Sequence, residues 1–465
     1  MLSIDPLQEN SGLKYLPQSQ FSSPNQELLP LTAKVNDRDC LEIGGCDVTT
    51  LVKRFGSPLY ILDEFSLRSA AAQYRDSFKK YYPGSSRVIY ASKAWSCLAI
   101  CNIINSEDLG IDVASGGELY TAVRAGIAGE KIYFHGNNKS APELAMAIEH
   151  QCTIMVDNWQ ELKTLVALAS SLSPDSAVKI MLRLTPGIEC HTHEYIRTGQ
   201  IDSKFGFDPN NLHSVFEYVS ENKQLNLLGL HAHIGSQIFE LQPHQDLAGV
   251  LIDWAIAAQK YGLSIKTINV GGGLGICYTE ADNPPSIEEW VKTVAEAMVA
   301  ACKARNLELP ELIAEPGRSI IGSACVTAYT VGSMKVIPGI RNYVSVDGGM
   351  SDNPRPIAYE SVYRAIVANK MSAPLKDKVT IAGKHCESGD ILIKDEILPQ
   401  LESGDILVIM GTGAYNYSMA SNYNRLTRPA AILVNAGEAN LILQRETYDD
   451  TIARDLVPQR LVDQV

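Results

Sequence analysis

The sequence contains no run of about 18 apolar residues, so we expect no helix that crosses a membrane. Residues 1–30 are polar and lack the apolar stretch of a secretory signal. The ten cysteines are scattered, without the dense spacing of a disulfide scaffold or a paired CxxC zinc pattern, so we expect reduced thiols in the cytoplasm. Acidic residues (53) outnumber basic ones (40), and the net charge of −13 disfavours a nucleic-acid-binding protein.

The chain of 465 residues is long enough for two domains or three. Its composition, 45% hydrophobic and 20% charged, is that of a globular protein. We expect residues 1–38 to form a flexible N-terminal tail and residues 39–64 to join a later β-domain. Residues 65–318 and 319–465 are expected to form the two domains described next.

Between residues 87 and 318, short β-rich runs alternate with longer amphipathic runs. The expected strands are residues 88–91, 111–114, 132–135, 153–156, 179–184, 228–233, 267–270 and 312–314. Helices are expected between them, for example over residues 117–125, 141–149 and 159–172. Eight strands, each followed by a helix, predict a (β/α)8 barrel. An open doubly wound sheet is the alternative, and the lack of a GxGxxG turn favours the closed barrel.

After residue 319 the pattern changes, because strand-like runs follow one another without intervening helices. These runs cover residues 325–331, 343–346, 378–382, 405–410 and 430–434. They predict an all-β C-terminal domain, which the early strand-like run at residues 59–62 is expected to join.

Two glycine-rich loops follow the last two strands of the predicted barrel, and chemistry in such barrels lies at the carboxyl ends of the strands. Gly271, Gly272 and Gly273 expose backbone N–H groups, and Gly317 with Arg318 adds further donors and a cation. A glycine triplet alone can be a tight turn, but the two loops together predict a phosphate site.

Lys93 follows the first barrel strand, where it points toward the same mouth. A lone lysine is more often a surface residue, but beside a phosphate site it can form a Schiff base with an aldehyde. The aldehyde-bearing phosphate cofactor that lysine holds is pyridoxal phosphate (PLP). Glu315, after the eighth strand, is then a candidate partner for the ring nitrogen, which must stay protonated for the ring to accept electrons.

Two His-x-His pairs allow a different interpretation, a zinc-dependent hydrolase. They are His191 with His193, and His231 with His233. Such a site needs further ligands after the later strands, where only glycines and Glu315 occur. We therefore predict no metal and expect His233 to stack on the cofactor ring.

Many motifs occur in an order that resembles one family, the diaminopimelate decarboxylases, which are fold III PLP-dependent decarboxylases of the alanine-racemase type. The barrel motifs are Tyr90-Ala91-Ser92-Lys93-Ala94, Phe134-His135-Gly136-Asn137-Asn138-Lys139-Ser140, His191-Thr192-His193-Glu194-Tyr195-Ile196, Asp202-Ser203-Lys204-Phe205-Gly206, His233-Ile234-Gly235-Ser236-Gln237, Gly271-Gly272-Gly273 and Glu315-Pro316-Gly317-Arg318. The later motifs are Val346-Asp347-Gly348-Gly349-Met350, Arg355-Pro356, Cys386-Glu387-Ser388-Gly389-Asp390, Gly413-Ala414-Tyr415 and Met419-Ala420-Ser421-Asn422-Tyr423-Asn424. The resemblance spans almost the whole chain after residue 38.

The resemblance implies a role for each of these residues. Lys93 would be the PLP Schiff-base lysine, with His233 on the ring and Glu315 at the ring nitrogen. The residues implied at or beside the phosphate are Ser236, Gly272, Gly273, Gly317 and Arg318, with Tyr415 also contacting the cofactor. The residues implied for the substrate are Arg318, Arg355, Tyr359, Glu387 and Tyr415. A homodimer is implied, in which the partner chain contributes the proton donor Cys386 and Glu387 to the active site.

The implied reaction is the decarboxylation of meso-2,6-diaminopimelate to L-lysine and CO2, the last step of lysine biosynthesis. Arg318 and Arg355 suit a distal carboxylate because guanidinium binds carboxylate in a bidentate fork. Two alternatives stay open: a sister decarboxylase acting on ornithine, arginine or carboxynorspermidine, and a non-catalytic PLP-binding relative. The presence of Lys93, Glu315 and Cys386 argues against the second.

Overall fold

Eight parallel strands form a closed barrel in the computed structural model, which describes residue 8 and residues 10–172, 177–188 and 203–462. The strands are β5 (Ser86–Ala91), β6 (Gly110–Val113), β7 (Ile132–Phe134), β8 (Thr153–Val156), β9 (Val178–Arg183), β10 (Leu225–His231), β11 (Thr267–Asn269) and β12 (Glu311–Ala314). The last strand pairs with the first, with Leu312 opposite Ser86. The predicted barrel is therefore confirmed, and the open sheet is not formed.

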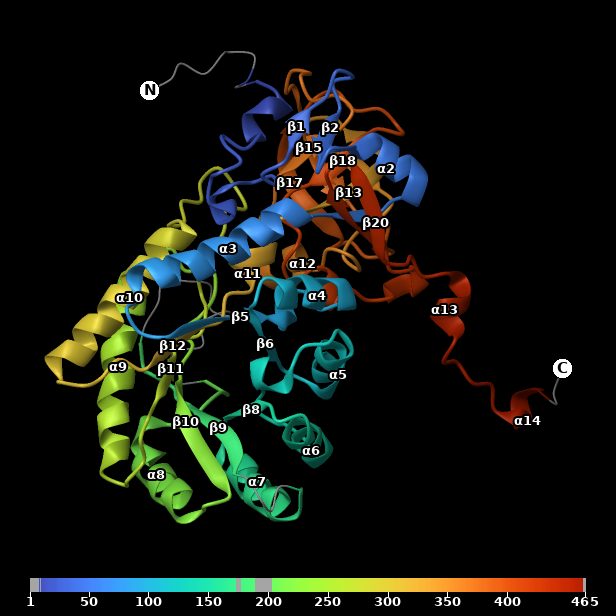
Figure 1. Ribbon diagram of the computed structural model, residues 1–465. Coiled ribbons are helices and arrows are strands. Elements are labelled where there is room, and N and C mark those ends of the chain that lie inside the picture. The colour runs from blue at the N-terminus through green and yellow to red at the C-terminus, as the bar shows by residue number, and fades with distance from the viewer. Residues whose placement is uncertain (1–7, 9, 173–176, 189–202, 463–465) are drawn as a thin grey trace.

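Helices cover the outside of the barrel (Figure 1). They are α3 (Glu64–Tyr81), α4 (Leu98–Ser106), α5 (Gly116–Arg124), α6 (Ala141–Glu149), α7 (Trp159–Leu172), α8 (Leu212–Glu221), α9 (Gln242–Gln259) and α10 (Ile287–Ala304). The short α11 (Arg318–Ile321) lies where the barrel meets the second domain. Capping boxes begin two of them, with Ser140 and Glu143 at α6 and Ser286 and Glu289 at α10. These side chains satisfy backbone groups that a helix end leaves unpaired, so the helix starts are encoded locally.

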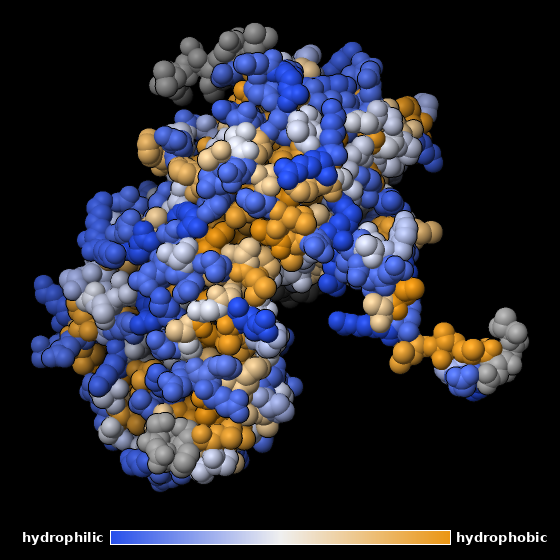
Figure 2. Space-filling model, turned by 45° about the vertical axis from the view of Figure 1, so that its right-hand side comes forward, coloured by the Kyte–Doolittle hydropathy of each residue, from blue (hydrophilic) through white to orange (hydrophobic). Residues whose placement is uncertain are grey.

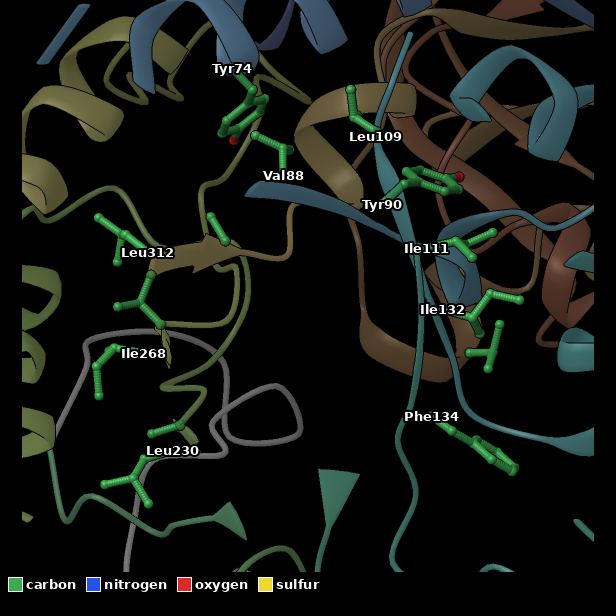
Figure 3. Close-up of a cluster of buried hydrophobic side chains, with 14 of the residues drawn as sticks. Tyr74, Val88, Tyr90, Leu109, Ile111, Ile132, Phe134, Leu230, Ile268 and Leu312 are labelled. Carbon is green, nitrogen blue, oxygen red and sulfur yellow. The ribbon is translucent and has the colours of Figure 1, made fainter. Parts of the chain in front are cut away.

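Barrel strands bury both faces, and alternate residues therefore face two different cores. Figure 3 shows Leu230, Ile268 and Leu312 in one row of the outer core, which the helices cover. The barrel interior holds a separate cluster, Ile89, Tyr133, Met155, Met181 and Ile313. Each member is one residue away from an outward-facing neighbour, so the strand period of two decides which side chains reach the barrel axis.

A second, mostly β domain follows the barrel. Its strands are β13 (Cys325–Ile337), β14 (Arg341–Val346), β15 (Ala365–Val367), β16 (Asp377–Ala382), β17 (Ile391–Leu398), β18 (Ile406–Ile409), β19 (Ala430–Asn435) and β20 (Glu438–Leu443). The early strand β4 (Leu59–Asp63) lies between β13 and β19, so this domain is discontinuous in sequence. A short helix, α12 (Arg355–Tyr359), lies between β14 and β15.

The N-terminal residues differ from the expected flexible tail. From Ser11 onward they pack against both domains, with Asn25 and Leu29 fully buried. They form η1 (Gly12–Tyr15), η2 (Pro24–Gln26) and the first strand of a small sheet, β1 (Lys34–Val35), β2 (Leu41–Ile43) and β3 (Cys46–Asp47), which precedes α2 (Val48–Phe55). The polar composition suggested disorder, but buried contacts spaced along the segment stabilise it.

The other end of the chain extends away from the two domains as α13 (Tyr448–Ile452) and α14 (Gln459–Val462) (Figure 1). Figure 2 shows apolar side chains on its surface, and Leu456 and Val457 are 92% and 68% exposed. Among the helices that the structure describes, none is long and apolar enough to span a membrane.

Candidate active site

A cavity of about 360 Å³ opens where the barrel strands end and the β-domain meets them. It is lined by every barrel residue proposed for the cofactor, and by residues of the β-domain. The sequence-predicted members of the lining are Lys93, His233, Ser236, Gly272, Gly273, Glu315, Gly317, Arg318, Arg355, Tyr359 and Tyr415. The structure thus brings together side chains that lie more than 300 residues apart in the sequence.

Inward-facing strand positions explain how the barrel residues reach the cavity. Glu315 is two residues beyond the interior residue Ile313, and His135 is two residues beyond Tyr133. The same spacing separates Arg183 from the interior Met181. Because side chains alternate along a strand, each of these polar residues continues an inward row into the mouth of the barrel.

Glu315 lies among three nitrogen donors. His135 Nε2 is 2.8 Å from its Oε1, His231 Nε2 is 3.1 Å from its Oε2, and Asn269 Nδ2 is 2.7 Å from its Oε1. Burial alone would raise the pKa of Glu315, but its interactions with the two histidines outweigh burial and hold that pKa well below the ordinary value. The cavity therefore contains a buried, ionised carboxylate.

The histidine that ends β10, His231, and the one two residues beyond it, His233, both take part in this site. Burial lowers the pKa of His231 to about 4, so a neutral His231 donates from Nε2 to Glu315. His233 Nδ1 accepts from the backbone N–H of Gly272 at 3.2 Å, and burial followed by the charge of Lys93 lowers the pKa of His233. Neutral His233 presents an uncharged ring to the cavity.

A three-residue set, His135, His231 and Glu315, has ligand atoms within 4.8 Å of one another, which is close enough for a metal ion. In the structure His135 and His231 each lie at hydrogen-bond distance from Glu315. The earlier candidates His191 and His193 lie outside the described residues.

The two glycine loops pack so closely against neighbouring segments that a side chain would clash with them. A Cβ on Gly272 would lie 2.4 Å from the carbonyl oxygen of Glu315, and one on Gly317 would lie 2.9 Å from Ala91 Cβ. Gly273 has φ +128°, which L side chains rarely adopt. These positions require glycine, and their bare backbone forms one wall of the cavity.

The cation of Arg318 stands beside these glycines. Its Nη2 donates to Ser236 Oγ at 3.0 Å and its Nη1 to Tyr278 Oη at 2.6 Å. The Arg318 guanidinium, the Ser236 hydroxyl and the backbone N–H groups of the glycines form a set of donors suited to a phosphate group.

Lys93 lies in η3 (Ser92–Ala94), the turn that follows β5, and its side chain is exposed to the cavity. The β-domain holds this turn in place, because the N–H of Tyr415 donates to the carbonyl oxygen of Ala94 at 2.7 Å. The Tyr415 ring is 4.8 Å from the Arg318 guanidinium and 5.6 Å from that of Arg355. One aromatic ring of the β-domain therefore lies close to both cations of the site.

Cys386 and Glu387 are placed elsewhere. Both are exposed on the loop between β16 and β17, and neither is among the residues that line this chain's cavity. The loop is held by Asn424, whose Oδ1 accepts from the backbone N–H of Cys386 at 2.8 Å. The structure thus gives these two residues a defined position without bringing them to Lys93 of the same chain.

The sequence reasoning missed Asp112, Arg183 and Asn269, and it left His135 without a role. Asp112 and Arg183 line the cavity, and Asn269 links Gly271 to Glu315. The available signal was the alternation of side chains along a strand, because each of these polar residues occupies an inward-facing position in a predicted strand.

Comparisons with known proteins give the family of the chain. The family described as "Pyridoxal-dependent decarboxylase, pyridoxal binding domain" matches residues 66–322. A diaminopimelate decarboxylase from Synechocystis sp. is 62% identical, over 99% of this chain and 100% of that protein. The chain belongs to the diaminopimelate decarboxylases. A Bacillus subtilis member of that family is 46% identical, over 91% of this chain and 97% of its own length.

Solved structures of the family share the fold. The diaminopimelate decarboxylase from M. jannaschii, crystallised with L-lysine, has a TM-score of 0.85 and 34% sequence identity. The match covers 92% of this chain and 99% of that one. Pyridoxal phosphate is the cofactor of this family, and the cavity described above has the lysine, the carboxylate and the anion cradle that it requires.

Proposed function

We infer that this protein decarboxylates meso-2,6-diaminopimelate to L-lysine and CO2, the last step of lysine biosynthesis. Its family relatives have this activity by name, and the M. jannaschii structure contains L-lysine. The observation that carries the inference is the buried Glu315, held by His135, His231 and Asn269 in the same cavity as Lys93 and an anion cradle.

The residues of the cavity fit pyridoxal phosphate. Lys93 would bind its aldehyde, His233 would lie against its ring, and Glu315 would face its ring nitrogen. The residues proposed for the phosphate or beside it are Ser236, Gly272, Gly273, Gly317 and Arg318, with Tyr415 as a further contact. When bound, this cofactor supplies an electron sink for the pair released as CO2 leaves.

Glu315 contributes by holding a proton on the ring nitrogen. A carboxylate that stays ionised in a buried site favours a protonated partner, and neutral His231 donates to it without competing for that proton. His135 and Asn269 fix its orientation. The carboxylate is therefore preorganised and needs no rearrangement during the reaction.

The substrate's second carboxylate and second amine require their own partners. We propose that Arg318 and Arg355 bind carboxylate, with Tyr359 and Tyr415 beside them. Arg355 is buried, and its ordered guanidinium suits a bidentate contact. Glu387 is proposed for the distal ammonium.

We propose a homodimer in which Cys386 and Glu387 enter the partner's cavity. Cys386 Sγ would return a proton to the carbon that lost its carboxylate. Their exposure at a distance from this chain's own cavity supports the proposal. So do the exposed apolar residues Ile357, Met419 and Tyr423 on the same domain, since such surface commonly marks a protein interface.

We also propose a cytoplasmic location and no nucleic-acid or membrane partner. The nine described cysteines are free thiols, and eight of them are buried. Thiols in this state are typical of a reducing compartment.

The direct test supplies purified protein and pyridoxal phosphate with meso-diaminopimelate, and measures CO2 and L-lysine. Ornithine, arginine and carboxynorspermidine are the comparison substrates, since a sister decarboxylase would prefer one of them. Release of CO2 from ornithine but not from meso-diaminopimelate would refute the proposed substrate.

Replacing Lys93 with Ala should abolish the visible absorbance of bound cofactor, and an unchanged spectrum would refute the role of Lys93.

A further inference from the structure

One polar residue of the N-terminal segment is completely buried behind the glycine loop of the cavity. Asn25, in η2, has no exposed surface. Its Nδ2 donates to the carbonyl oxygens of Gly275, at 3.1 Å, and Pro285, at 2.9 Å. The backbone carbonyl oxygen of Asn25 accepts from the backbone N–H of Cys277 at 2.9 Å. Asn25 thus bonds to Gly275 through its side chain and to Cys277 through its backbone, and these are the residues on either side of Ile276.

The loop that Asn25 holds has little regular structure of its own. Residues 270–280 form no helix or named strand, apart from an isolated bridge between Leu274 and Ile238. On the inner side, Ile238 accepts from the N–H of Gly275 at 3.2 Å and donates to the carbonyl oxygen of Gly273 at 3.0 Å. Gly275 is therefore fixed between Ile238 inside and Asn25 outside, two residues from the cavity-lining Gly273.

The same segment reaches the second half of the anion cradle. Ser323 Oγ donates to the carbonyl oxygen of Pro24 at 2.6 Å. Ser323 follows α11, which begins with the cavity residue Arg318. Adjacent residues of one segment, Pro24 and Asn25, therefore bond to the loop that follows β11 and to the residues that follow α11.

A further set of bonds anchors the segment itself. Ser23 Oγ lies 2.8 Å from Asn25 Oδ1 and accepts from the N–H of Ile287, at the start of α10, at 3.0 Å. Gln73 Nε2, on α3, donates to the carbonyl oxygen of Ser22 at 3.1 Å. Asn25 is thus fixed relative to the barrel helices α3 and α10, and its bonds to the loop fix the loop relative to the same helices.

We propose that Asn25 is a positioning residue for the cofactor, acting through the backbone of Gly275 and Cys277 to hold the phosphate cradle in its binding shape. The proposal rests on the proposed function, because it requires pyridoxal phosphate in the cavity. Without the amide donors, two buried carbonyl oxygens lose their partner, and the loop must either leave them unpaired or move to find others.

The test uses Asn25→Asp and Asn25→Ala in the full-length protein. Asn25→Asp keeps the shape of the side chain but places an acidic group against two carbonyl oxygens, whereas Asn25→Ala removes the donors without adding a charge, so an effect common to both variants reports the lost hydrogen bonds. We expect the dissociation constant of pyridoxal phosphate, measured by absorbance titration without substrate, to rise about tenfold or more in both variants. Once saturated with cofactor, Asn25→Asp should turn over within about twofold of the parent, because Asn25 touches no reacting atom.

Lys34→Ala is the matched control. Lys34 lies in the same N-terminal segment, where its exposed side chain pairs with Glu42 at 2.9 Å, and it does not line the cavity. Its cofactor affinity should equal that of the parent. An equal loss in Lys34→Ala would show that the segment acts only through general stability, and the proposal would be overturned.

Other outcomes are equally decisive. Parental cofactor affinity in Asn25→Asp would overturn the proposal while leaving the proposed function intact. Failure of the parent protein to bind pyridoxal phosphate would instead contradict the proposed function. If neither Asn25 variant folds, Asn25→Ser, which shortens the side chain and removes the bonds to Gly275 and Pro285 without adding a charge, decides: weaker cofactor binding supports the proposal, and unchanged binding overturns it.

Discussion

Replacing Glu315 with Gln is the sharpest test of the electrostatics of the cavity, because the change removes a charge and almost no volume. The amide oxygen can still accept from Asn269 and His135, which both face Oε1 at 2.7–2.8 Å. The new amide nitrogen would face His231 Nε2, which can accept if its proton moves to Nδ1, an atom with no partner within the described residues. We therefore expect the variant to fold and to retain the cofactor.

The expected loss lies in turnover. A hydrogen bond to a charged group is worth about 1.5–3 kcal/mol, and the charge on Glu315 is needed to keep the ring nitrogen protonated. Losing that contact should lower kcat by roughly 10- to 150-fold. The assay is CO2 release at saturating substrate, with bound cofactor verified by its absorbance. Glu311→Gln, at the other end of the same strand, is the control and should be close to the parent. Turnover within twofold of the parent in cofactor-loaded Glu315→Gln would refute the reasoning.

Three further predictions test the cradle, the core and the shared site. Gly272→Ala should weaken cofactor binding at least about tenfold, because its Cβ would lie 2.4 Å from a backbone carbonyl oxygen. The control is Gly117→Ala, whose Cβ would have its nearest atom at 3.8 Å and which should leave cofactor binding unchanged. Equal affinities in the two variants would contradict the steric argument. Burial lowers the pKa of His244 to about 3. As the pH falls from 6.5 to 3, His244 is therefore protonated in the unfolded chain but not in the folded one, which lowers the free energy of unfolding by about 5 kcal/mol. His244→Leu should lose less stability over that window in urea unfolding, and a parallel loss would count against a buried neutral imidazole. Mixing Lys93→Ala with Cys386→Ala protein should restore activity through hybrid dimers, and inactive, verified heterodimers would contradict a shared active site.

The barrel was predictable from local patterns. The expected strand at residues 153–156 and the expected helices at residues 141–149 and 159–172 coincide with β8, α6 and α7. These elements carry their own signals, which are capping residues at α6 and apolar residues at the strand or helix period. Strands β15, β17 and β20 were missed. Strand β20 is largely exposed, so it lacks a clear apolar alternation, and its pairing with β19 defines it.

The N-terminal segment was misjudged for a related reason. Asn25 and Ser23 are typical of flexible polar chain in composition, yet both are buried. Their hydrogen-bond partners, Gly275, Pro285 and Ile287, lie about 250 residues or more away in sequence. No local pattern reports a partner at that separation, so the order of this segment was not predictable from its own residues.

The sequence by itself determined which residue types can bind an aldehyde, an anion or a protonated ring nitrogen. It also determined which of them lie on the inward face of a strand, because side chains alternate along strands. Only the tertiary structure decided that Glu315 is ionised, that His231 supports it, and that Asn25 braces the glycine loop. The reason is physical. Burial, hydrogen-bond partners and charge neighbours are properties of the closed barrel and its packed domains, and they arise only when distant segments come into contact.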